Sequence, residues 1–471
     1  MTALASTASG ASFARTFKGT ISTRDCSDYD TARAVWNSDA NRYPLAVVRP
    51  TDVEDVVAAV RFAREAAVPL AVRCGGHSYQ GHSTCDGGVV IDLSAHMGHV
   101  RLAADASAVH AHGGARLGAV DRATLAAGRV VPAGIVSHTG LGGLALGGGI
   151  GHLTRSFGLT CDQFVRLEVV TAAGDVVHAS DTENPELFWA LQGGGGNFGV
   201  VTDFECRTHQ LGPIQSGLLV YPMEQAADRI RTIAELMDHM PRELSVILSL
   251  AIRPDRTPLA GTVNAASRFL GVYVTYRGNP DDDALRELRA AGSPVHDSVQ
   301  PADYLQVQQR FDAVSQHGVG WYMKSGHARA LNADLVEIMV ENAMAFQAVA
   351  AADVHREVYA IQSLGGAASD VAEDASAYSG RDAQWHCAIE VGYLSAEERE
   401  RIVGWTRQSW ARTEQHLDMA TSYVNLNFED GPEAVQKVYG AHKVDRLRRV
   451  KAEFDPDNVF NLNVNIAPAI H

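Results

Sequence analysis

The residues best placed to do chemistry in this sequence lie in three loops that are dense in glycine. They are Arg73-Cys-Gly-Gly-His-Ser-Tyr-Gln-Gly81, the run from Gly140 to Gly151, and Gly193-Gly-Gly-Gly-Asn-Phe-Gly199. Glycine reaches positive φ without strain and lets a ligand approach the main chain closely. Successive backbone N–H groups in such turns form a concave site for an anion. One such loop is common, but three in the first half of a chain indicate an extended ligand that carries a pyrophosphate.

A Rossmann dinucleotide fold is the main alternative explanation for these loops. Residues 194–199 match the G-x-G-x-x-G pattern, and residues 140–145 match its alanine variant. The pattern requires a strand before the loop and a helix after it. The third loop has a predicted helix before it and a strand after it. The second loop runs into more glycine, which predicts a poor helix. We therefore do not expect a Rossmann fold.

Composition and charge argue against several classes of partner. The chain has 471 residues, of which 46% are hydrophobic and 20% are charged, enough for more than one folded unit. Its net charge of −15 argues against nucleic acid and anionic membranes, which attract a basic surface. The sequence lacks a run of about 18 apolar residues that would predict a membrane span. Its N-terminus also lacks the apolar segment of a signal peptide. We therefore expect a cytoplasmic protein that binds neither nucleic acid nor membrane.

The cysteines and histidines do not form a recognisable metal motif. The six cysteines are scattered without a C-x-x-C pair, which argues against a zinc ribbon or a thioredoxin-type redox site. His110 and His112 alternate along a predicted strand beside two glycines. This pattern is more typical of surface or packing positions than of metal ligands. The sequence therefore predicts no metal site.

The predicted helices and strands that must position the loops differ before and after about residue 212. Residues 43–50 and 69–73 predict strands, and the capping box Thr51-Asp-Val-Glu54 predicts the start of a helix between them. After Leu211-Gly-Pro213 the glycine-rich runs stop, and longer amphipathic helices alternate with strands. We place a domain boundary there, at residue 212.

Several motifs together resemble those of the berberine bridge enzyme-like flavoproteins, within the vanillyl-alcohol-oxidase superfamily. The first two glycine-rich loops match, as does the run from Asp181 to Thr202 that contains the third. The C-terminal matches are Tyr423-Val-Asn425, Tyr439-Gly440 and Phe454-Asp-Pro-Asp-Asn-Val-Phe-Asn-Leu-Asn-Val-Asn465-Ile. The resemblance extends from about residue 43 to the end of the chain and is loose only between residues 213 and 420.

This resemblance implies an α+β fold in two parts. An FAD-binding domain of the PCMH type would comprise residues 43–212 together with a returning C-terminal segment, residues 421–471. A substrate-binding domain, an antiparallel sheet backed by helices, would comprise residues 213–420. Residues 1–42 would form an N-terminal lead-in. The implied division agrees with the change in composition at residue 212.

The resemblance also implies how FAD is attached. In the family the histidine of the G-G-H-S motif is bonded to the 8α-methyl carbon of the flavin, and that position is His77 here. Many members carry a second bond from a cysteine in an A-G-x-C-x-x-x-G segment. The segment here runs from Ala133 to Gly140, and Val136 stands in the place of the cysteine. A valine cannot form a thioether, so we expect FAD with a single covalent link to His77.

Further contacts with FAD are implied by the same resemblance. They come from the three glycine-rich loops, from the strand after the third loop and from the C-terminal segment. The expected residues are Arg73, Cys74, Gly75, Gly76, Ser78, Gly134, His138, Thr139, Gly140, Gly143, Leu144, Gly149, Gly196, Val200, Val201, Asn425, Asn463 and Asn465.

Oxidation of a substrate on a flavin needs a base near the ring, which takes a proton while a hydride is transferred. In related oxidases the tyrosine of a Y-x-N motif has this role, which indicates Tyr423, with Asn425 beside it. Glu357, Tyr359 and Gln362, on a predicted strand that ends at Gln362, could line the opposite wall, and Glu357 is the second catalytic candidate. Alternation places Glu357 and Tyr359 on one face, so Gln362 faces away unless the strand contains a bulge.

Three interpretations of function remain open. The leading one is an oxidase that takes a hydride from an alcohol, amine or natural-product intermediate and passes electrons to O2, giving H2O2. The second is a dehydrogenase of the same fold with another acceptor. In either case the resemblance implies that Thr139 helps to decide whether oxygen reaches the reduced flavin. The third is a non-catalytic flavin-binding protein. The expected partners are a small-molecule substrate and O2, and the sequence leaves the substrate and the oligomeric state open.

Overall fold

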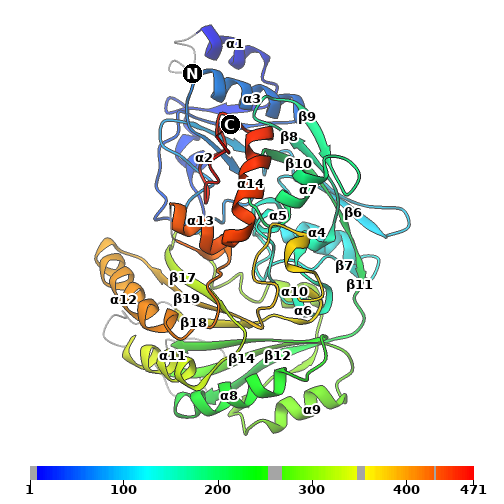
Figure 1. The fold of residues 1–471 in the computed structure, drawn as a ribbon, viewed down its shortest axis with the longest axis vertical. Coiled ribbons are helices and arrows are strands. Elements are labelled where there is room, and N and C mark those ends of the chain that lie inside the picture. The colour runs from blue at the N-terminus through cyan, green and yellow to red at the C-terminus, as the bar shows by residue number, and fades with distance from the viewer. Residues whose placement is uncertain (1–7, 253–267, 347–355, 429–430, 471) are drawn as a thin grey trace.

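Three larger β-sheets and the return of the C-terminus organise the chain (Figure 1). The computed structural model describes residues 8–252, 268–346, 356–428 and 431–470. The N-terminal sheets lie in one half of the molecule together with the C-terminal helices, and the largest sheet lies in the other half (Figure 1).

The first sheet has the strand order β1-β2-β4-β3 and is mostly parallel. Both β2 and β3 pair in parallel with β4, and α3 connects them, as the predicted strand–helix–strand unit requires. Phe62 of α3 stacks on Phe13 of α1 at a centroid distance of 4.8 Å, which closes a core above the sheet. The elements are α1 (Ala8–Thr16), β1 (Thr20–Ser22), α2 (Tyr29–Arg33), β2 (Ala46–Arg49), α3 (Val53–Glu65), β3 (Leu70–Arg73) and β4 (Val89–Asp92).

Helix α3 is capped one residue later than the sequence predicted. Its N-cap is Asp52, whose side chain accepts a hydrogen bond of 3.0 Å from the backbone nitrogen of Asp55. The hydroxyl of Thr51 donates to the carboxylate of Asp55 instead of accepting from the helix. The capping box of Thr51 and Glu54 was therefore wrong, because the side chain of Asp55 turns back and binds Thr51.

The second sheet is antiparallel, with the order β5-β6-β10-β8-β9. Its strands are β5 (Val100–Leu102), β6 (Ala108–His112), β8 (Phe164–Val170), β9 (Val176–Ala179) and β10 (Val200–Arg207). The helices between them are α4 (Leu117–Leu125), α5 (Leu141–Leu146), α6 (Thr154–Phe157) and α7 (Pro185–Leu191). A separate two-stranded pair consists of β7 (Arg129–Val130) and β11 (His209–Gln210).

A short helix, α5, forms in the second glycine-rich loop, where the sequence predicted none. Leu141, Ala145 and Leu146 are buried in the core, and this burial offsets the poor helix propensity of the neighbouring glycines. The Rossmann interpretation still fails, because the sheet around the third loop is antiparallel and a Rossmann sheet is mostly parallel. The third loop follows α7 and precedes β10, as predicted.

The third sheet is antiparallel and has helices on one face. Its order is β15-β12-β14-β13-β18-β19-β17, with β16 paired to β12. Its strands are β12 (Ile214–Pro222), β13 (Leu244–Ile252), β14 (Arg268–Arg277), β15 (His296–Asp297), β16 (Gln300–Pro301), β17 (Gly320–Ala328), β18 (Arg356–Ser363) and β19 (Trp385–Tyr393). The helices are α8 (Ala226–Met237), α9 (Asp283–Ala290), α10 (Tyr304–Gln308), α11 (Ala333–Ala345) and α12 (Ala396–Glu414). In Figure 1, α8, α9 and α11 lie on the side of this sheet away from the first two sheets, and α12 lies beside β17 and β19.

The C-terminal segment returns to the glycine-rich loops through α13 (Pro432–Tyr439) and α14 (Ala441–Phe454). Lys451 is completely buried and connects this segment to the third loop. Its Nζ donates to the carbonyl oxygens of Asn197 and Phe460, at 2.7 and 2.9 Å, and to the carboxylate of Asp455 at 2.6 Å. These charge-assisted bonds fix the C-terminal segment beside the loops.

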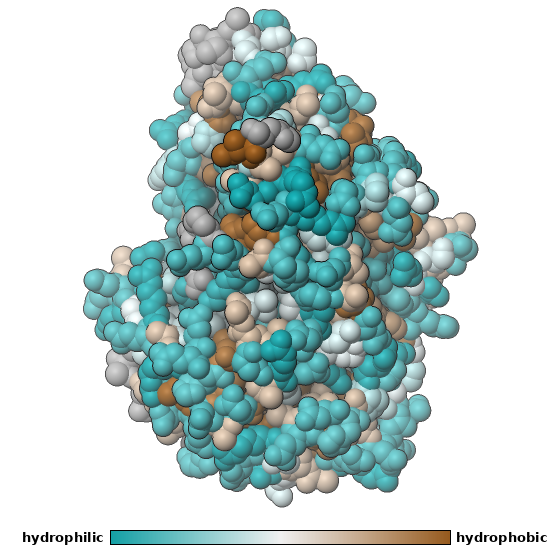
Figure 2. Space-filling model, in the orientation of Figure 1, coloured by the Kyte–Doolittle hydropathy of each residue, from teal (hydrophilic) through white to brown (hydrophobic). Residues whose placement is uncertain are grey.

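The surface in view is mainly hydrophilic. On the face shown in Figure 2, hydrophobic residues are seen as small separate groups among polar ones. Within the described residues, none of the helices has the length and apolar character needed to cross a membrane.

Candidate active site

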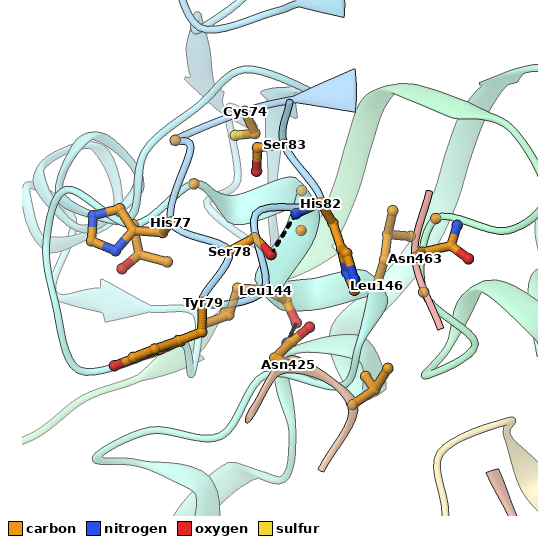
Figure 3. A pocket seen from close by; sticks show the side chains of 18 of the residues that line it. Cys74, His77, Ser78, Tyr79, His82, Ser83, Leu144, Leu146, Asn425 and Asn463 are labelled. Atoms are coloured by element: carbon orange, nitrogen blue, oxygen red, sulfur yellow. Dashed lines mark hydrogen bonds between the residues drawn. The ribbon is translucent and has the colours of Figure 1, made fainter. Parts of the chain in front are cut away.

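A cavity of about 350 Å³ lies where the glycine-rich loops, the C-terminal segment and the third sheet meet. Its walls include residues of all three loops, of the strands β17, β18 and β19, and of the segments on either side of α13 and α14. Figure 3 shows His77 and Tyr79 of the first loop at one side of this cavity and Asn463 of the C-terminal segment at the other. A cavity of this size with convergent polar groups is typical of a small-molecule site.

The first and second glycine-rich loops cross at the edge of the cavity. A Cβ atom on Gly75 would collide with the backbone of Gly140, and one on Gly140 would collide with the backbone of Gly75. Only glycine at both positions permits so close an approach of two main chains. Gly76 follows with a φ of +69°, which turns the first loop so that His77 reaches the cavity wall.

Most of the expected cofactor contacts are brought together on the wall of this cavity. Those that line it are Cys74, Gly75, Gly76, His77, Ser78, Gly134, Thr139, Gly140, Gly143, Leu144, Gly196, Val200, Val201, Asn425 and Asn463. These residues come from separate parts of the sequence, so their convergence is a property of the fold.

Four expected contacts do not line the cavity. Arg73 is buried beneath it, where its guanidinium binds the carboxylate of Asp92 at 2.7 Å and backbone carbonyl oxygens, so its role is to support the loop. His138 contacts His77. Gly149 donates its backbone N–H to Tyr423. Asn465 has a buried Oδ1 atom without a hydrogen-bond partner among the described residues.

The cavity has the features that a bound FAD requires. At Gly143 and Gly196 the main chain faces open space, since no atom of the described residues lies within 4 Å of the position a Cβ would take. On the wall, Oδ1 of Asn463 and Nε2 of Gln80 are buried and have no hydrogen-bond partner in the part of the chain that the structure describes. Accessible main chain and unsatisfied polar atoms suit an extended polar ligand that completes their hydrogen bonds. The residues present therefore fit FAD.

The ring of His77 is held by two neighbours. It stacks on the buried Trp36 at a centroid distance of 4.8 Å, with 19° between the ring planes. Its Nε2 atom forms a hydrogen bond of 2.6 Å with Nδ1 of His138. Burial, and then the nearby His138, His317 and Arg116, lower the pKa of His77 to about 2. The imidazole is therefore neutral near pH 7 and keeps a lone pair on one nitrogen.

Three histidines converge at this point. His77, His138 and His317 each present a nitrogen within 4.8 Å of the others, so this part of the described chain could hold a metal ion. The sequence drew attention instead to His110 and His112, which belong to β6 of the second sheet. Spacing could not reveal the cluster, because its members come from three loops far apart in the sequence.

A second covalent bond to the cofactor would need a reactive sulfur atom at the cavity wall, and Val136 and Cys74 are the two positions that bear on this. Val136, in the place of the family's second linking residue, lines the cavity. Cys74 also lines it, but its thiol donates to the carbonyl oxygen of Ala115 at 3.2 Å. Burial raises the pKa of the Cys74 thiol to about 11. Since the thiolate is the nucleophilic form, Cys74 is poorly suited to bond a cofactor.

Tyr423 presents its hydroxyl to three N–H donors at the cavity wall. The Oη atom accepts from the backbone nitrogens of Gly149 at 3.0 Å and Ile150 at 3.4 Å, and from Nδ2 of Asn425 at 2.8 Å. Asn425 also donates to the carbonyl oxygen of Leu144 at 3.0 Å, which fixes the orientation of its amide. Burial raises the pKa of Tyr423 to about 12, and the three bonds act in the opposite direction. An oxygen with three N–H donors is suited to carry negative charge.

The third sheet supplies further polar and aromatic wall residues. His386 and Glu390 lie on one face of β19, Gln362 comes from β18 and Trp321 from β17. Both ring nitrogens of His386 are buried without a hydrogen-bond partner from the described residues, and burial holds its pKa well below the usual value. The sequence analysis missed His386, Glu390 and Trp321. Alternation along β19 could have indicated His386 and Glu390, because the residues between and beside them, Cys387, Ile389 and Val391, pack in the core with the helices.

For Glu357 the structure describes the backbone in β18, and its side chain lies outside what is described. Its backbone pairs with Ala251 beyond an irregularity in the register of β18. Past this irregularity Tyr359 faces the core, where its hydroxyl accepts a bond of 2.9 Å from Asn342, while Gln362 lines the cavity. The expectation that Tyr359 could line the wall was therefore wrong, and Gln362 takes that place.

Comparisons with known proteins agree with this arrangement. Residues 44–180 match the family model described as FAD binding domain, and residues 422–467 match the one described as berberine and berberine like. The chain is 31% identical over 439 residues to an FAD-linked oxidoreductase of Dictyostelium discoideum, covering 92% of this chain and 91% of that protein. The chain therefore belongs to the berberine bridge enzyme-like FAD-linked oxidoreductases.

Two further relatives support the class of enzyme. The chain is 28% identical over 463 residues to (R)-6-hydroxynicotine oxidase of Paenarthrobacter nicotinovorans, covering 96% of this chain and 97% of the relative. It is similar to the structure of xylooligosaccharide oxidase from Myceliophthora thermophila in complex with xylobiose, with a TM-score of 0.83 and 26% identity, covering 99% of this chain and 100% of the other. The predicted family, the α+β fold of the PCMH type and the assignment as an FAD-dependent oxidoreductase are confirmed.

Proposed function

We propose that this protein is an oxidase that removes a hydride from an alcohol, amine or natural-product intermediate and passes electrons to O2, with release of H2O2. The observation that carries the proposal is a single cavity that joins His77, the expected attachment point of FAD, to Tyr423 and its three N–H donors. The names of the relatives, a hydroxynicotine oxidase and a xylooligosaccharide oxidase, support oxidase chemistry without selecting one substrate.

In this mechanism Tyr423 receives the proton that the substrate loses from its O–H or N–H group. Bound FAD would accept the hydride and return the electrons to O2. Asn425 and the backbone N–H groups of Gly149 and Ile150 stabilise negative charge on Oη before the proton arrives. Because the pKa of Tyr423 is raised to about 12 by burial, we expect substrate oxidation to accelerate as the pH rises.

We further propose that FAD is held by one covalent bond, to His77. The support is that Val136 offers no sulfur at the cavity wall and that the thiol of Cys74 is engaged with Ala115. The remaining wall residues from the glycine-rich loops, with Asn425 and Asn463, would contact the cofactor without a covalent bond.

The chemistry of the wall favours a substrate that contains a ring. Trp321, Phe311 and Tyr79 supply aromatic surface, on which a ring can stack, and His386 and Gln362 supply polar groups that can orient it. Glu357 remains a second candidate for a catalytic contact from β18.

The division of the chain into residues 1–42, 43–212, 213–420 and 421–471 is also a proposal. It is supported by the end of the second sheet before residue 212 and the start of the third sheet at Ile214. A cytoplasmic location and the absence of nucleic-acid and membrane partners are proposals that rest on the charge and composition of the sequence.

The deciding experiment is anaerobic mixing of the purified holoenzyme with a panel that contains (R)-6-hydroxynicotine, xylobiose, and aromatic alcohols and amines. Flavin absorbance reports reduction, and O2 is then admitted while H2O2 is measured. An oxidase gives rapid reduction by at least one compound and rapid reoxidation with one H2O2 per turnover. A reduced flavin that persists in O2 would instead support the dehydrogenase. Absence of reduction by every compound, with full FAD content, would support a non-catalytic flavin-binding protein.

A further inference from the structure

The contact between His77 and His138 restricts which nitrogen of His77 can react. The two rings meet through Nε2 of His77 and Nδ1 of His138 at 2.6 Å, so one of these nitrogens carries a proton and the other accepts it. Trp36 stacks on the face of His77 at 4.8 Å and limits rotation of its ring. The Nε2 atom is thus engaged with a protein partner, which leaves Nδ1 of His77 for a ligand in the cavity.

The backbone that carries His138 is held in place by a separate contact. The neighbouring Ser137 donates its backbone N–H and its hydroxyl to the carboxylate of Asp312, at 2.8 and 2.6 Å. The backbone nitrogen of Thr139 donates to the carbonyl oxygen of Val136 at 3.2 Å. These bonds fix the turn from which His138 reaches His77, so the contact is built into the second loop.

We propose that His138 is a positioning residue for flavin attachment: it holds His77 with its lone pair on Nδ1 and accepts the proton that Nε2 loses when the bond forms. This inference rests on the proposed covalent link between His77 and FAD. With Nε2–H donating to His138, neutral His77 has its free lone pair on Nδ1, and a lone pair is what a nucleophile requires. Burial keeps His77 neutral, since it lowers its pKa to about 2.

The attachment step balances with O2 as the oxidant. A bond forms between Nδ1 of His77 and the 8α-methyl carbon of FAD, and that carbon loses one hydrogen as a proton. Nε2 of His77 loses the second proton to Nδ1 of His138. The two electrons released reduce the flavin, and O2 reoxidises it with formation of H2O2. Afterwards Nδ1–H of His138 donates to the bare Nε2 of His77, so the same hydrogen bond persists with its direction reversed.

His317 offers the proton a way to solvent. It is exposed, and its ring lies 5.6 Å from that of His138 and 5.8 Å from that of His77. Burial, then the neighbouring histidines and the positive charge of Arg116, lower the pKa of both His77 and His317, which disfavours retention of a proton within the cluster. The same charge opposes binding of a metal cation by the three imidazoles.

The proposal is tested by the rate of covalent attachment. Wild type, His138→Ala, His138→Asn and His317→Gln are produced without covalent flavin, from a riboflavin-limited expression host, and incubated with FAD in air. At intervals the protein is denatured, and the flavin that stays attached is measured by absorbance and intact mass. Circular dichroism and the fluorescence of bound FAD report folding and cofactor binding independently of activity.

We expect attachment to slow by about 10²-fold in His138→Ala, the usual scale for loss of a proton-transfer group, and free imidazole to restore part of the rate. His138→Asn keeps an acceptor oxygen near the position of Nδ1 but cannot take up the proton. Its rate should lie between those of His138→Ala and wild type. His317→Gln should slow attachment less than His138→Ala.

Attachment at the wild-type rate in both His138 variants would overturn the inference. If His138→Ala does not bind FAD, His138→Asn decides alone, and a wild-type rate there has the same meaning. Loss of attachment in wild type treated with EDTA would overturn it in favour of a metal site. A wild type without attached flavin, or a His77→Ala variant that retains it, would instead refute the proposed link, whereas equal rates in wild type and the His138 variants refute only the role of His138.

Discussion

The hydroxyl oxygen of Tyr423 lies 3.0 Å from the backbone nitrogen of Gly149, so the C-terminal segment places a phenol against the end of the second glycine-rich loop. These residues are separated by more than half of the chain. Gly149 has a φ of +87°, a left-handed conformation that aims its N–H toward the phenol. The position of Tyr423 relative to the cofactor loop is therefore set by the main chain of that loop.

Substitution Tyr423→Phe removes the proton acceptor but keeps the buried ring. We expect flavin reduction by substrate to slow by about 10²- to 10⁴-fold, the range typical of a general base, while FAD content stays unchanged. Stopped-flow absorbance under anaerobic conditions measures the rate. Tyr359→Phe is the matched control, because its hydroxyl bonds Asn342 and Thr413 within the core of the third sheet. Equal reduction rates in Tyr423→Phe and wild type would remove Tyr423 from this role.

Substitution Asn425→Ala removes one of the three donors to Tyr423. The bond from Asn425 lowers the pKa of Tyr423, so its loss raises that pKa further above the usual value for tyrosine. The reactive form then appears only at higher pH, and the alkaline rise in the rate of flavin reduction should move to higher pH. The same substitution in a Tyr423→Phe background should cause no such movement. A shift of equal size in both backgrounds would show that Asn425 acts through another group.

Substitution Val136→Cys restores the sulfur that the family's second link uses. Since Val136 lines the cavity, we expect a second covalent bond, and the double variant with His77→Ala should retain flavin after denaturation. Intact mass and absorbance of the denatured protein measure the attachment. Ile135→Cys, at the adjacent wall position, should leave a free thiol. Complete release of flavin from the double variant would indicate that residue 136 does not face the expected part of the cofactor.

Substitution Lys451→Met removes the cation that joins the C-terminal segment to the third glycine-rich loop. It leaves the carboxylate of Asp455 buried without its partner, and breaking such a pair costs about 3–5 kcal/mol of unfolding free energy. We expect a marked fall in Tm and weaker FAD retention, measured by thermal denaturation with and without added FAD. Lys18→Met, which breaks an exposed pair with Asp52, should change Tm little. An unchanged Tm in Lys451→Met would mean that the buried pair does not stabilise this junction.

The parts of the fold that the sequence predicted were those with local causes. Alternating and helical apolar patterns predicted the strands β2 and β3 and the third loop between α7 and β10. The glycine-rich loops predicted the cofactor site, because each signals close approach of a ligand to the main chain. The helix α5 could not be predicted, since burial of Leu141 and Leu146 by residues distant in sequence overrides the local propensity of glycine.

The side-chain arrangement on the cavity wall was harder to predict for a related reason. The partnership of His77 with His138 joins two loops, and the orphan nitrogens of His386 depend on packing that no spacing encodes. Tyr359 and Gln362 face opposite sides of β18, as alternation requires, but a register shift separates Tyr359 from Glu357, and alternation alone cannot locate that shift. Family resemblance supplied Tyr423 and Asn425, whereas their shared hydrogen bonds became visible only in three dimensions.

The contact of Gly75 with Gly140 couples the effects of substitutions at these two positions. A methyl group on either residue would push the loop of His77 away from the loop of Thr139, although neither glycine carries a group that reacts. Random mutagenesis that scores flavin attachment would therefore recover both glycines as intolerant sites. A larger residue at one position could be accommodated only if the backbone at the other position moved. Sequence changes in the two loops are therefore expected to be coupled.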